Sequence, residues 1–325
     1  MTTTTAEHTE TNLKGTLIAL IASTVWALTG VFIRILTEQY QLPPLILAFW
    51  RNFFTVIFLV LALLLIKPKL LRFPKEQFGY LLAFGLVLAL FNCLWTTSVA
   101  QTGAAIATVL SYTSGAFTAI LGRWLLDEEL YLGKWLAILC CFGGVVLISG
   151  IMQAESLTLN PVGVVLGAVS GLLYAAYSLM GRIASQRQIN PWTTLLYTFG
   201  FATLILFGIN LGLSDILPGT IQTFADFFWL GNVWQGWLVL VALAAGPTLL
   251  GYGLYNVSLS LLPSSVANLL VTTEPPITAL LAYVLLGEML TGVQIGGGLL
   301  ILLGVIFLRI NPRAKTQANQ PQMHV

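Results

Sequence analysis

Two charged side chains in otherwise apolar stretches are the first candidates for chemistry. Glu274 lies in the stretch 263–286 and Arg51 in the stretch 43–66. At 1.5 Å per helical residue, they lie about 16 Å and about 12 Å from the ends of these stretches. A charge at such depth in a bilayer costs about 2.5–3.5 kcal/mol, so each should face the protein interior or a wet cavity. Two roles stay open: a structural ion pair between them, or binding of a substrate or a proton by at least one.

Three prolines lie near these charges along the chain. Pro275 and Pro276 follow Glu274 directly, and Pro247 follows Gly246 in the stretch 234–257. Proline removes a backbone donor and blocks the preceding turn, so both helices should be kinked or broken at depth. The carbonyl groups freed at such a break can line a cavity, although a kink that only improves packing is an equal alternative.

Polar and aromatic residues at similar depths complete the candidate binding set. Besides Arg51 and Glu274 it contains Trp26, Trp50, Asn92, Trp95, Tyr112, Thr273 and Tyr255. Aromatic rings with hydrogen-bonding ends suit an amphipathic organic solute, whereas a polyanion would need several lysines or arginines. For any single member of the set, packing is the competing interpretation.

Composition defines the elements that must position these residues. The chain has 325 residues, 57% of them hydrophobic and 8% charged, with a mean hydropathy of +0.89. Soluble domains have about 25% charged residues, so this is an all-α integral membrane protein. Ten apolar stretches are long enough to cross a bilayer as helices: 13–36, 43–66, 78–98, 102–126, 130–150, 160–182, 190–213, 234–257, 263–286 and 291–309.

The basic residues predict the orientation of these helices. If the N-terminus is cytoplasmic, 12 of the 14 lysines and arginines fall in cytoplasmic segments, as the positive-inside rule requires. We therefore expect a multi-pass membrane protein with two disordered cytoplasmic tails, 1–12 and 311–325. The net charge of +2 is not gathered in one patch, which excludes nucleic acid as a partner.

The chain contains an internal duplication. Trp26 corresponds to Tyr174 at an offset of 148, and Gly144 corresponds to Gly304 at an offset of 160. Each repeat, 13–150 and 160–310, holds five helices, so the second must enter the membrane from the opposite side, as in inverted-repeat transporters. The positions that correspond to Glu274 and Arg51 hold Ser114 and Phe199, so the shared scaffold does not require the two charges.

Smaller signals indicate packing and capping. Glycines four residues apart occur as Gly167 and Gly171, as Gly208 and Gly212, and as Gly292 and Gly296; this spacing favours close packing of helices in lipid. Glu128 and Glu288 belong to a repeated LL-x-E sequence at helix ends, where a carboxylate stabilises the N-terminus of the following helix.

Sequence features of an intramembrane enzyme are missing. The two histidines, His8 and His324, lie in the tails, and there is no HExxH sequence. Cys93, Cys140 and Cys141 have no metal-ligand spacing. We expect no catalytic residues, no metal and no cofactor, although transferase chemistry at Arg51 and Glu274 stays formally open.

Three segments resemble the EamA-type members of the drug/metabolite transporter superfamily. They are FWRNFF around Arg51, TTEPPITALLAYVLLGEMLTGVQIGGGLLILLGV from Thr272, and the weaker copy LSYTSGAFTAILGRWLLDEELYLGKWLAILCCFGGVVLIS from Leu110. The resemblance covers about residues 13–310. It implies a bundle of ten helices around a central cavity. The resemblance also implies that such a protein moves small organic solutes, often amino acids or related metabolites, out of the cell across the plasma (inner) membrane. Ser114 and Gly115 stand where the family pattern has a proline, so the break in that helix should be absent or glycine-based.

The functional hypothesis is therefore a transporter that works by alternating access without ATP. A flippase for lipid-linked substrates is the main alternative. A homodimer and coupling to protons through Glu274 are both compatible with the sequence.

Overall fold

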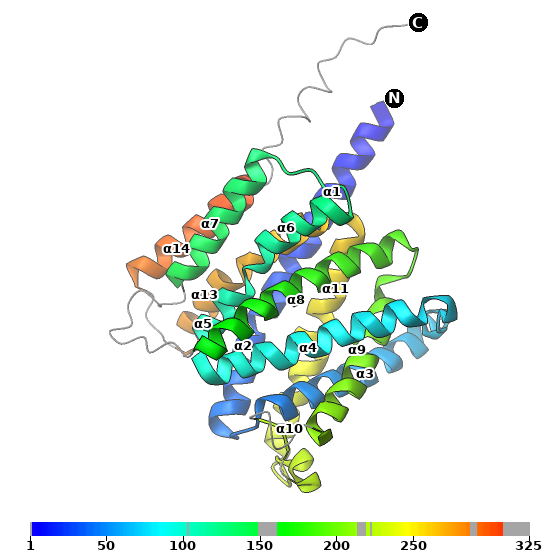
Figure 1. The fold of residues 1–325 in the computed structure, drawn as a ribbon, viewed down its shortest axis with the longest axis vertical. Coiled ribbons are helices and arrows are strands. Elements are labelled where there is room, and N and C mark those ends of the chain that lie inside the picture. Colours follow the sequence, from blue (N-terminus) through cyan, green and yellow to red (C-terminus); the bar gives the residue numbers. More distant parts are fainter. Residues whose placement is uncertain are drawn as a thin grey trace, which may run out of the picture.

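The computed structural model describes residues 2–102, 104–148, 161–212, 219–221, 223–286 and 291–307, and these contain helices and no strand. Figure 1 shows the helices packed as a bundle, with α7 and α14 side by side at one edge. The helices are α1 (Thr2–Ala27), α2 (Thr29–Arg34), α3 (Pro44–Ile66), α4 (Phe78–Thr102), α5 (Ala104–Ser111), α6 (Ser114–Leu125), α7 (Leu132–Ile148), α8 (Pro161–Gln186), α9 (Pro191–Gly212), α10 (Trp234–Leu243), α11 (Leu249–Leu261), α12 (Ser264–Leu270), α13 (Glu274–Leu286) and α14 (Gly292–Phe307).

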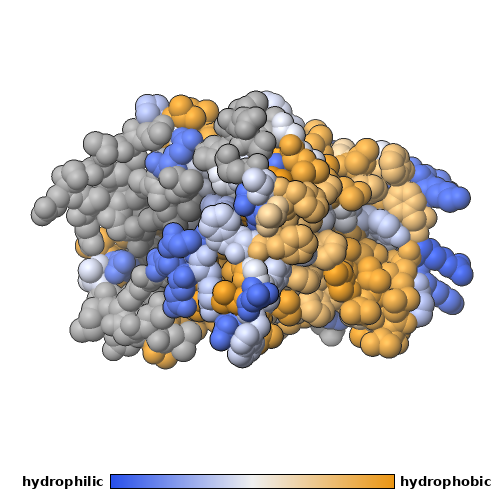
Figure 2. All heavy atoms as spheres, turned by 90° about the horizontal axis from the view of Figure 1, so that it is seen from below, coloured by the Kyte–Doolittle hydropathy of each residue, from blue (hydrophilic) through white to orange (hydrophobic). Residues whose placement is uncertain are grey.

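The described helices have the length and surface of a membrane protein. Six helical runs are long and apolar enough to cross a bilayer: Leu13–Gln39, Pro44–Ile66, Lys75–Ser98, Pro161–Gln186, Pro191–Gly212 and Trp234–Leu261. Apolar side chains cover much of the coloured surface in Figure 2. Leu139 and Leu204, for example, are each 67% exposed in the structure. Such an apolar exterior is unfavourable in water and suits lipid.

The N-terminal end differs from the expected disordered tail. Helix α1 begins at Thr2, so it includes the Thr-rich residues 2–12. Once the apolar part of α1 has formed, each further residue adds a backbone hydrogen bond without a new nucleation cost. The expected C-terminal tail, 311–325, and Glu288 lie outside the described residues.

Two helical rods are interrupted at positions 160 residues apart. Helix α6 restarts at Ser114 after a turn at Tyr112 and Thr113, and α13 restarts at Glu274 after the 3₁₀ turn Val271–Thr273. The threonine hydroxyl next to each restart donates to the carbonyl three residues earlier: Thr113 to Leu110 at 2.6 Å and Thr273 to Leu270 at 2.9 Å.

Such local hydroxyl bonds compete with the helical ladder. The first rod is therefore broken without a proline, and its break precedes Gly115. In the second rod, Pro275 and Pro276 lie in the first turn of α13, where a missing backbone N–H costs little.

Pro247 also interrupts a helix, as its sequence position predicts. It lies in a π-helical turn, Ala244–Thr248, between α10 and α11. Thr55 of α3 donates to the carbonyl oxygen of Ala244 at 3.3 Å, so a neighbouring helix satisfies a backbone group at this irregular turn.

The glycine spacing predicts packing at some positions and not at others. A Cβ atom added at Gly171 would lie 2.7 Å from the backbone oxygen of Leu110, so α8 and the end of α5 are in close contact. At Gly208, Gly212, Gly292 and Gly296 an added Cβ would meet no described atom within 4 Å. The expectation of close packing was therefore wrong for these four glycines within the described chain.

Candidate functional site

A cavity of about 130 Å³ lies between helices of the two halves of the chain. It is smaller than the roughly 300–1,000 Å³ of pockets for drug-sized ligands, so its size favours a small solute. The residues that line it are Trp26, Thr29, Ile33, Arg51, Phe91, Asn92, Trp95, Thr108, Ser111, Tyr112, Tyr174, Thr248, Tyr252 and Glu274.

Arg51 reaches the cavity from α3 and is held by α4. Its side chain is 7% exposed, and its Nη2 donates to Oδ1 of Asn92 at 2.6 Å. Arg51 Nε and Asn92 Nδ2 are buried and have no hydrogen-bond partner within the described part of the chain. Unsatisfied buried polar atoms are rare in proteins. Among the described residues, five of them belong to side chains that line this one cavity: Trp26 Nε1, Thr29 Oγ1, Arg51 Nε, Asn92 Nδ2 and Thr248 Oγ1.

Glu274 faces the same cavity as the first residue of α13. Tyr112, at the break between α5 and α6, donates to Glu274 Oε2 at 2.9 Å. The start of a helix is favourable for a carboxylate, because the exposed N–H groups and the helix dipole attract negative charge.

The two charges do not neutralise each other directly. The ion pairs among the described residues join Arg123 to Asp127 and Lys134 to Glu128, and none joins Arg51 to Glu274. Of the two roles left open by the sequence, the structural ion pair is therefore wrong in this conformation.

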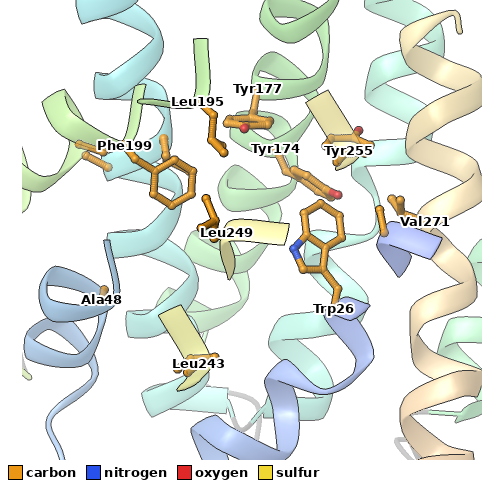
Figure 3. Packing of buried hydrophobic residues seen from close by; sticks show 14 of the residues in the cluster. Trp26, Ala48, Tyr174, Tyr177, Leu195, Phe199, Leu243, Leu249, Tyr255 and Val271 are labelled. Atoms are coloured by element: carbon orange, nitrogen blue, oxygen red, sulfur yellow. The ribbon is translucent and has the colours of Figure 1, made fainter. Parts of the chain in front are cut away.

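Aromatic rings from both halves form much of the remaining wall. Trp26 of α1 points toward α11, with its ring centroid 4.8 Å from that of Tyr252 and 5.2 Å from that of Tyr255. Tyr174 of α8 stacks on Phe91 of α4 at 5.4 Å. Figure 3 shows Trp26, Tyr174 and Tyr255 converging from three helices.

The structure brings together six of the nine candidate binding residues. Trp26, Arg51, Asn92, Trp95, Tyr112 and Glu274 line the cavity, whereas Trp50, Thr273 and Tyr255 are not among its lining residues.

The three others have contacts elsewhere. Trp50 Nε1 donates to the carbonyl of Phe227 at 2.6 Å and so holds the 3₁₀ helix Phe224–Phe228 against α3. Thr273 forms a 2.8 Å hydroxyl pair with Ser23, and Tyr255 is fully buried behind Trp26 with its hydroxyl 2.7 Å from that of Ser178.

Eight lining residues lie outside the set of nine, and the internal duplication gives a signal for two of them. One of these two, Tyr252, is also among the polar and aromatic residues that the sequence places at similar depth. Tyr174 corresponds to Trp26 at the offset of 148, and Tyr252 corresponds to Asn92 at the offset of 160. The duplication could therefore have pointed to both, since a cavity between two similar halves draws on equivalent positions.

A second, apolar pocket of about 190 Å³ adjoins the first, and Tyr112 lines both. Its wall includes Leu139 and Phe142 of α7, which are 67% and 40% exposed on the outer surface. This pocket therefore lies close to the lipid-facing side of the bundle.

Comparisons with known proteins give one consistent result. The model of the EamA-like transporter family matches residues 13–150 and, separately, residues 161–310. A probable amino-acid metabolite efflux pump of Salmonella typhimurium is 25% identical over 89% of this chain and 92% of its own length. The threonine/homoserine exporter RhtA of the same species is 28% identical over 70% of each chain.

Two further proteins are similar over most of the chain. An uncharacterised transporter of Synechocystis is 28% identical over 91% of this chain and 93% of its own length. One solved crystal structure has a TM-score of 0.74 and 17% sequence identity, covering 93% of this chain and 98% of that one. At this identity the structural match supports the fold alone.

Proposed function

Since the chain belongs to the EamA-like transporter family, we propose that this membrane transporter exports an amino acid or a related small metabolite across the plasma membrane. The observation that carries the proposal is the cavity, because it is enclosed by both halves of the chain and exposes an arginine and a glutamate that do not pair with each other. The names of two similar proteins, an amino-acid metabolite efflux pump and a threonine/homoserine exporter, support this substrate class.

The proposed architecture is ten membrane crossings in two inverted five-helix repeats, 13–150 and 160–310. Contacts between α7 and α14 support it. A Cβ added at Gly144 would lie 2.6 Å from the carbonyl oxygen of Gly297, and one added at Gly304 would lie 3.1 Å from that of Ala137. Each contact maps onto the other by the offset of 160, which is the reciprocity expected across a two-fold axis.

The packing of whole helices follows the same correspondence between the two halves of the chain. Helix α4 packs on α8, and α11, which corresponds to α4, packs on α1, which corresponds to α8. With two such halves, exchanging their packings turns a cavity open to one side into a cavity open to the other, which is alternating access. Solute moves when this exchange occurs around the occupied site.

The proposed orientation places both termini in the cytoplasm. Single cysteines in the two tails, in a background without the three native cysteines, should be labelled by a membrane-impermeant maleimide only after the cells are opened. Labelling of the two tails from opposite faces would overturn both the orientation and the inverted repeat.

The substrate class is tested by counterflow. Purified protein in liposomes loaded with unlabelled amino acids should take up the same labelled amino acid, with threonine and homoserine first in the panel. Glu274→Gln should lower this exchange and remove its pH dependence if protons are coupled to transport, while α-helical content stays unchanged. An absence of counterflow for every member of a panel of amino acids and related metabolites, with correctly folded protein, would overturn the proposal.

A lipid-linked substrate is the second candidate, because the apolar pocket next to the cavity reaches the lipid-facing side of α7. In that case a solute carrying an acyl chain should compete with threonine for uptake more strongly than the free solute does. We also propose that the protein is not an enzyme. If solutes in the same liposomes were chemically converted without crossing the membrane, that result would favour the alternative of a transferase at Arg51 and Glu274.

A further inference from the structure

We propose that Arg51 and Asn92 form a carboxylate subsite of the cavity and that Glu274 receives an ammonium group, so that the site selects organic zwitterions. This inference rests on the proposed function and narrows its substrate class to molecules that carry both charges at once.

The Arg51–Asn92 pair is arranged as a set of donors. Because Asn92 turns its amide oxygen to Arg51 Nη2 at 2.6 Å, its own Nδ2 is left to donate elsewhere. Nδ2 of Asn92 and Nε of Arg51 are both buried without a partner among the residues that the structure describes, and both side chains line the cavity. Two such N–H donors, one of them cationic, match the two oxygens of a carboxylate.

The internal duplication shows that the scaffold does not require this polar pair. Arg51 corresponds to Phe199 at the offset of 148, and Asn92 corresponds to Tyr252 at the offset of 160. Phe199 and Tyr252 are also in contact, with ring centroids 5.1 Å apart. In one half the contact is an aromatic pair, and in the other half the same place holds an arginine and an asparagine.

Glu274 supplies the opposite sign. Tyr112 donates to one of its oxygens, and a carboxylate has about four lone-pair sites, so acceptor capacity is left for an ammonium group. Tyr252 lines the same cavity as Arg51 and Glu274. The cavity thus joins a donor side to an acceptor side.

A ligand that carries both charges would compensate both Arg51 and Glu274 in the cavity wall, whereas a ligand with one charge would leave the other group uncompensated. In a low-dielectric site an uncompensated charge is unfavourable. The preference for zwitterions is therefore expected to be a property of the pair of subsites, with each subsite responsible for one end of the ligand.

The test uses ligands and variants that each lack one charge. The ligands are threonine, leucine and phenylalanine, the amide of each, which lacks the carboxylate, and the N-acetyl form of each, which lacks the ammonium group. They compete for counterflow in proteoliposomes of the wild type, Arg51→Gln, Asn92→Ala and Glu274→Gln. Arg123→Gln is the control, because Arg123 is 52% exposed and lies outside the cavity.

In the wild type and the control, the amide and the N-acetyl form should each compete at least about tenfold more weakly than the parent amino acid. Arg51→Gln should make amide and parent equal while the N-acetyl form stays weak, and Asn92→Ala should act in the same direction. Glu274→Gln should make the N-acetyl form compete as well as the parent amino acid, while the amide stays weak.

Equal weakening of all ligands by Arg51→Gln would mean that Arg51 only supports the fold, and it would overturn the inference. Should that variant fail to fold, the wild type decides alone, because equal competition by the three forms of an amino acid also overturns it. Counterflow of amino acids without this selectivity would leave the proposed function standing, whereas no counterflow at all would remove both.

Discussion

The carboxylate of Glu128 accepts two hydrogen bonds from Ser264, one from the backbone N–H and one from the hydroxyl, both at 2.6 Å. Its other oxygen accepts from the backbone N–H of Ser265 at 3.2 Å and from the hydroxyl of the same residue, and Lys134 Nζ lies 3.5 Å away. A residue between α6 and α7 thereby caps the first turn of α12. The two halves of the chain are joined at this point by a buried, charged contact.

Glu128→Gln should destabilise the protein markedly. The amide cannot accept from four donors and leaves Lys134, which is 2% exposed, without its ionic partner; breaking a buried pair in this way costs about 3–5 kcal/mol. Unfolding in detergent, followed by circular dichroism, measures the loss. Glu76→Gln, at an exposed position away from this contact, is the control and should stay within about 0.5 kcal/mol of the wild type.

The double variant Glu128→Gln, Lys134→Met separates the two causes. Removing the unpaired ammonium group should recover part of the stability, because only the capping bonds are then lost. A double variant no more stable than the single one would show that the charge of Lys134 contributes nothing.

Gly144 sets the distance between α7 and α14. An alanine Cβ there would lie 2.6 Å from the backbone oxygen of Gly297, so Gly144→Ala should force the helices apart and cost about 1–3 kcal/mol. Gly143→Ala is a matched control one residue away, since its Cβ would meet only a side-chain atom of Leu300 at 3.4 Å. Thermal unfolding in detergent compares the two; equal midpoints would contradict the close contact.

Some site residues could be predicted because their chemistry contrasts with their surroundings. Arg51 and Glu274 stand out in apolar stretches, and only an interior cavity makes such charges acceptable in a membrane. Arg51 lines the cavity and Trp50 does not, although both were predicted to bind substrate. Neighbouring residues on a helix point about 100° apart, so when Arg51 faces the cavity, Trp50 faces another partner.

Other features depend on partners that no local pattern identifies. The sequence indicates that Glu128 caps a helix, and the nearest candidate is α7, yet its donors are 136 residues away in α12. Because Ser114 and Gly115 stand where the family pattern has a proline, the break in this helix was expected to be absent or glycine-based. The break is present at Thr113, and a hydrogen bond from the Thr113 hydroxyl to the carbonyl of Leu110 accompanies it. Thr248 lines the cavity from a π-helical turn, where the extra residue shifts which side chains face inward.

Tyr112→Phe should weaken substrate binding without unfolding the protein. The variant removes the 2.9 Å hydrogen bond that orients Glu274 and keeps the ring. A bond to a charged group contributes about 1.5–3 kcal/mol, so KM for counterflow should rise roughly tenfold or more. Tyr197→Phe is the control, because the Tyr197 hydroxyl donates to the carbonyl of Leu71 outside the cavity. An unchanged KM in Tyr112→Phe would mean that the orientation of Glu274 does not limit binding.

Trp26→Phe and Trp50→Phe should affect different properties, although both residues were predicted to bind substrate. Trp26 lines the cavity and packs on Tyr252, so its replacement removes part of the wall and should raise KM several-fold. Trp50 holds Phe227 by its indole N–H at 2.6 Å, so Trp50→Phe should release the 3₁₀ helix Phe224–Phe228 from α3 and leave KM near the wild-type value.

Limited proteolysis near that 3₁₀ helix and counterflow kinetics measure the two effects on the same preparations. Trp50→Phe removes both the indole N–H and the larger ring that packs on Phe228 and Trp237, so faster cleavage in this variant would follow from the loss of these contacts. A raised KM in Trp50→Phe, with cleavage unchanged, would instead show that Trp50 contributes to substrate binding. The wall of the binding site on α3 would then include Trp50 as well as Arg51.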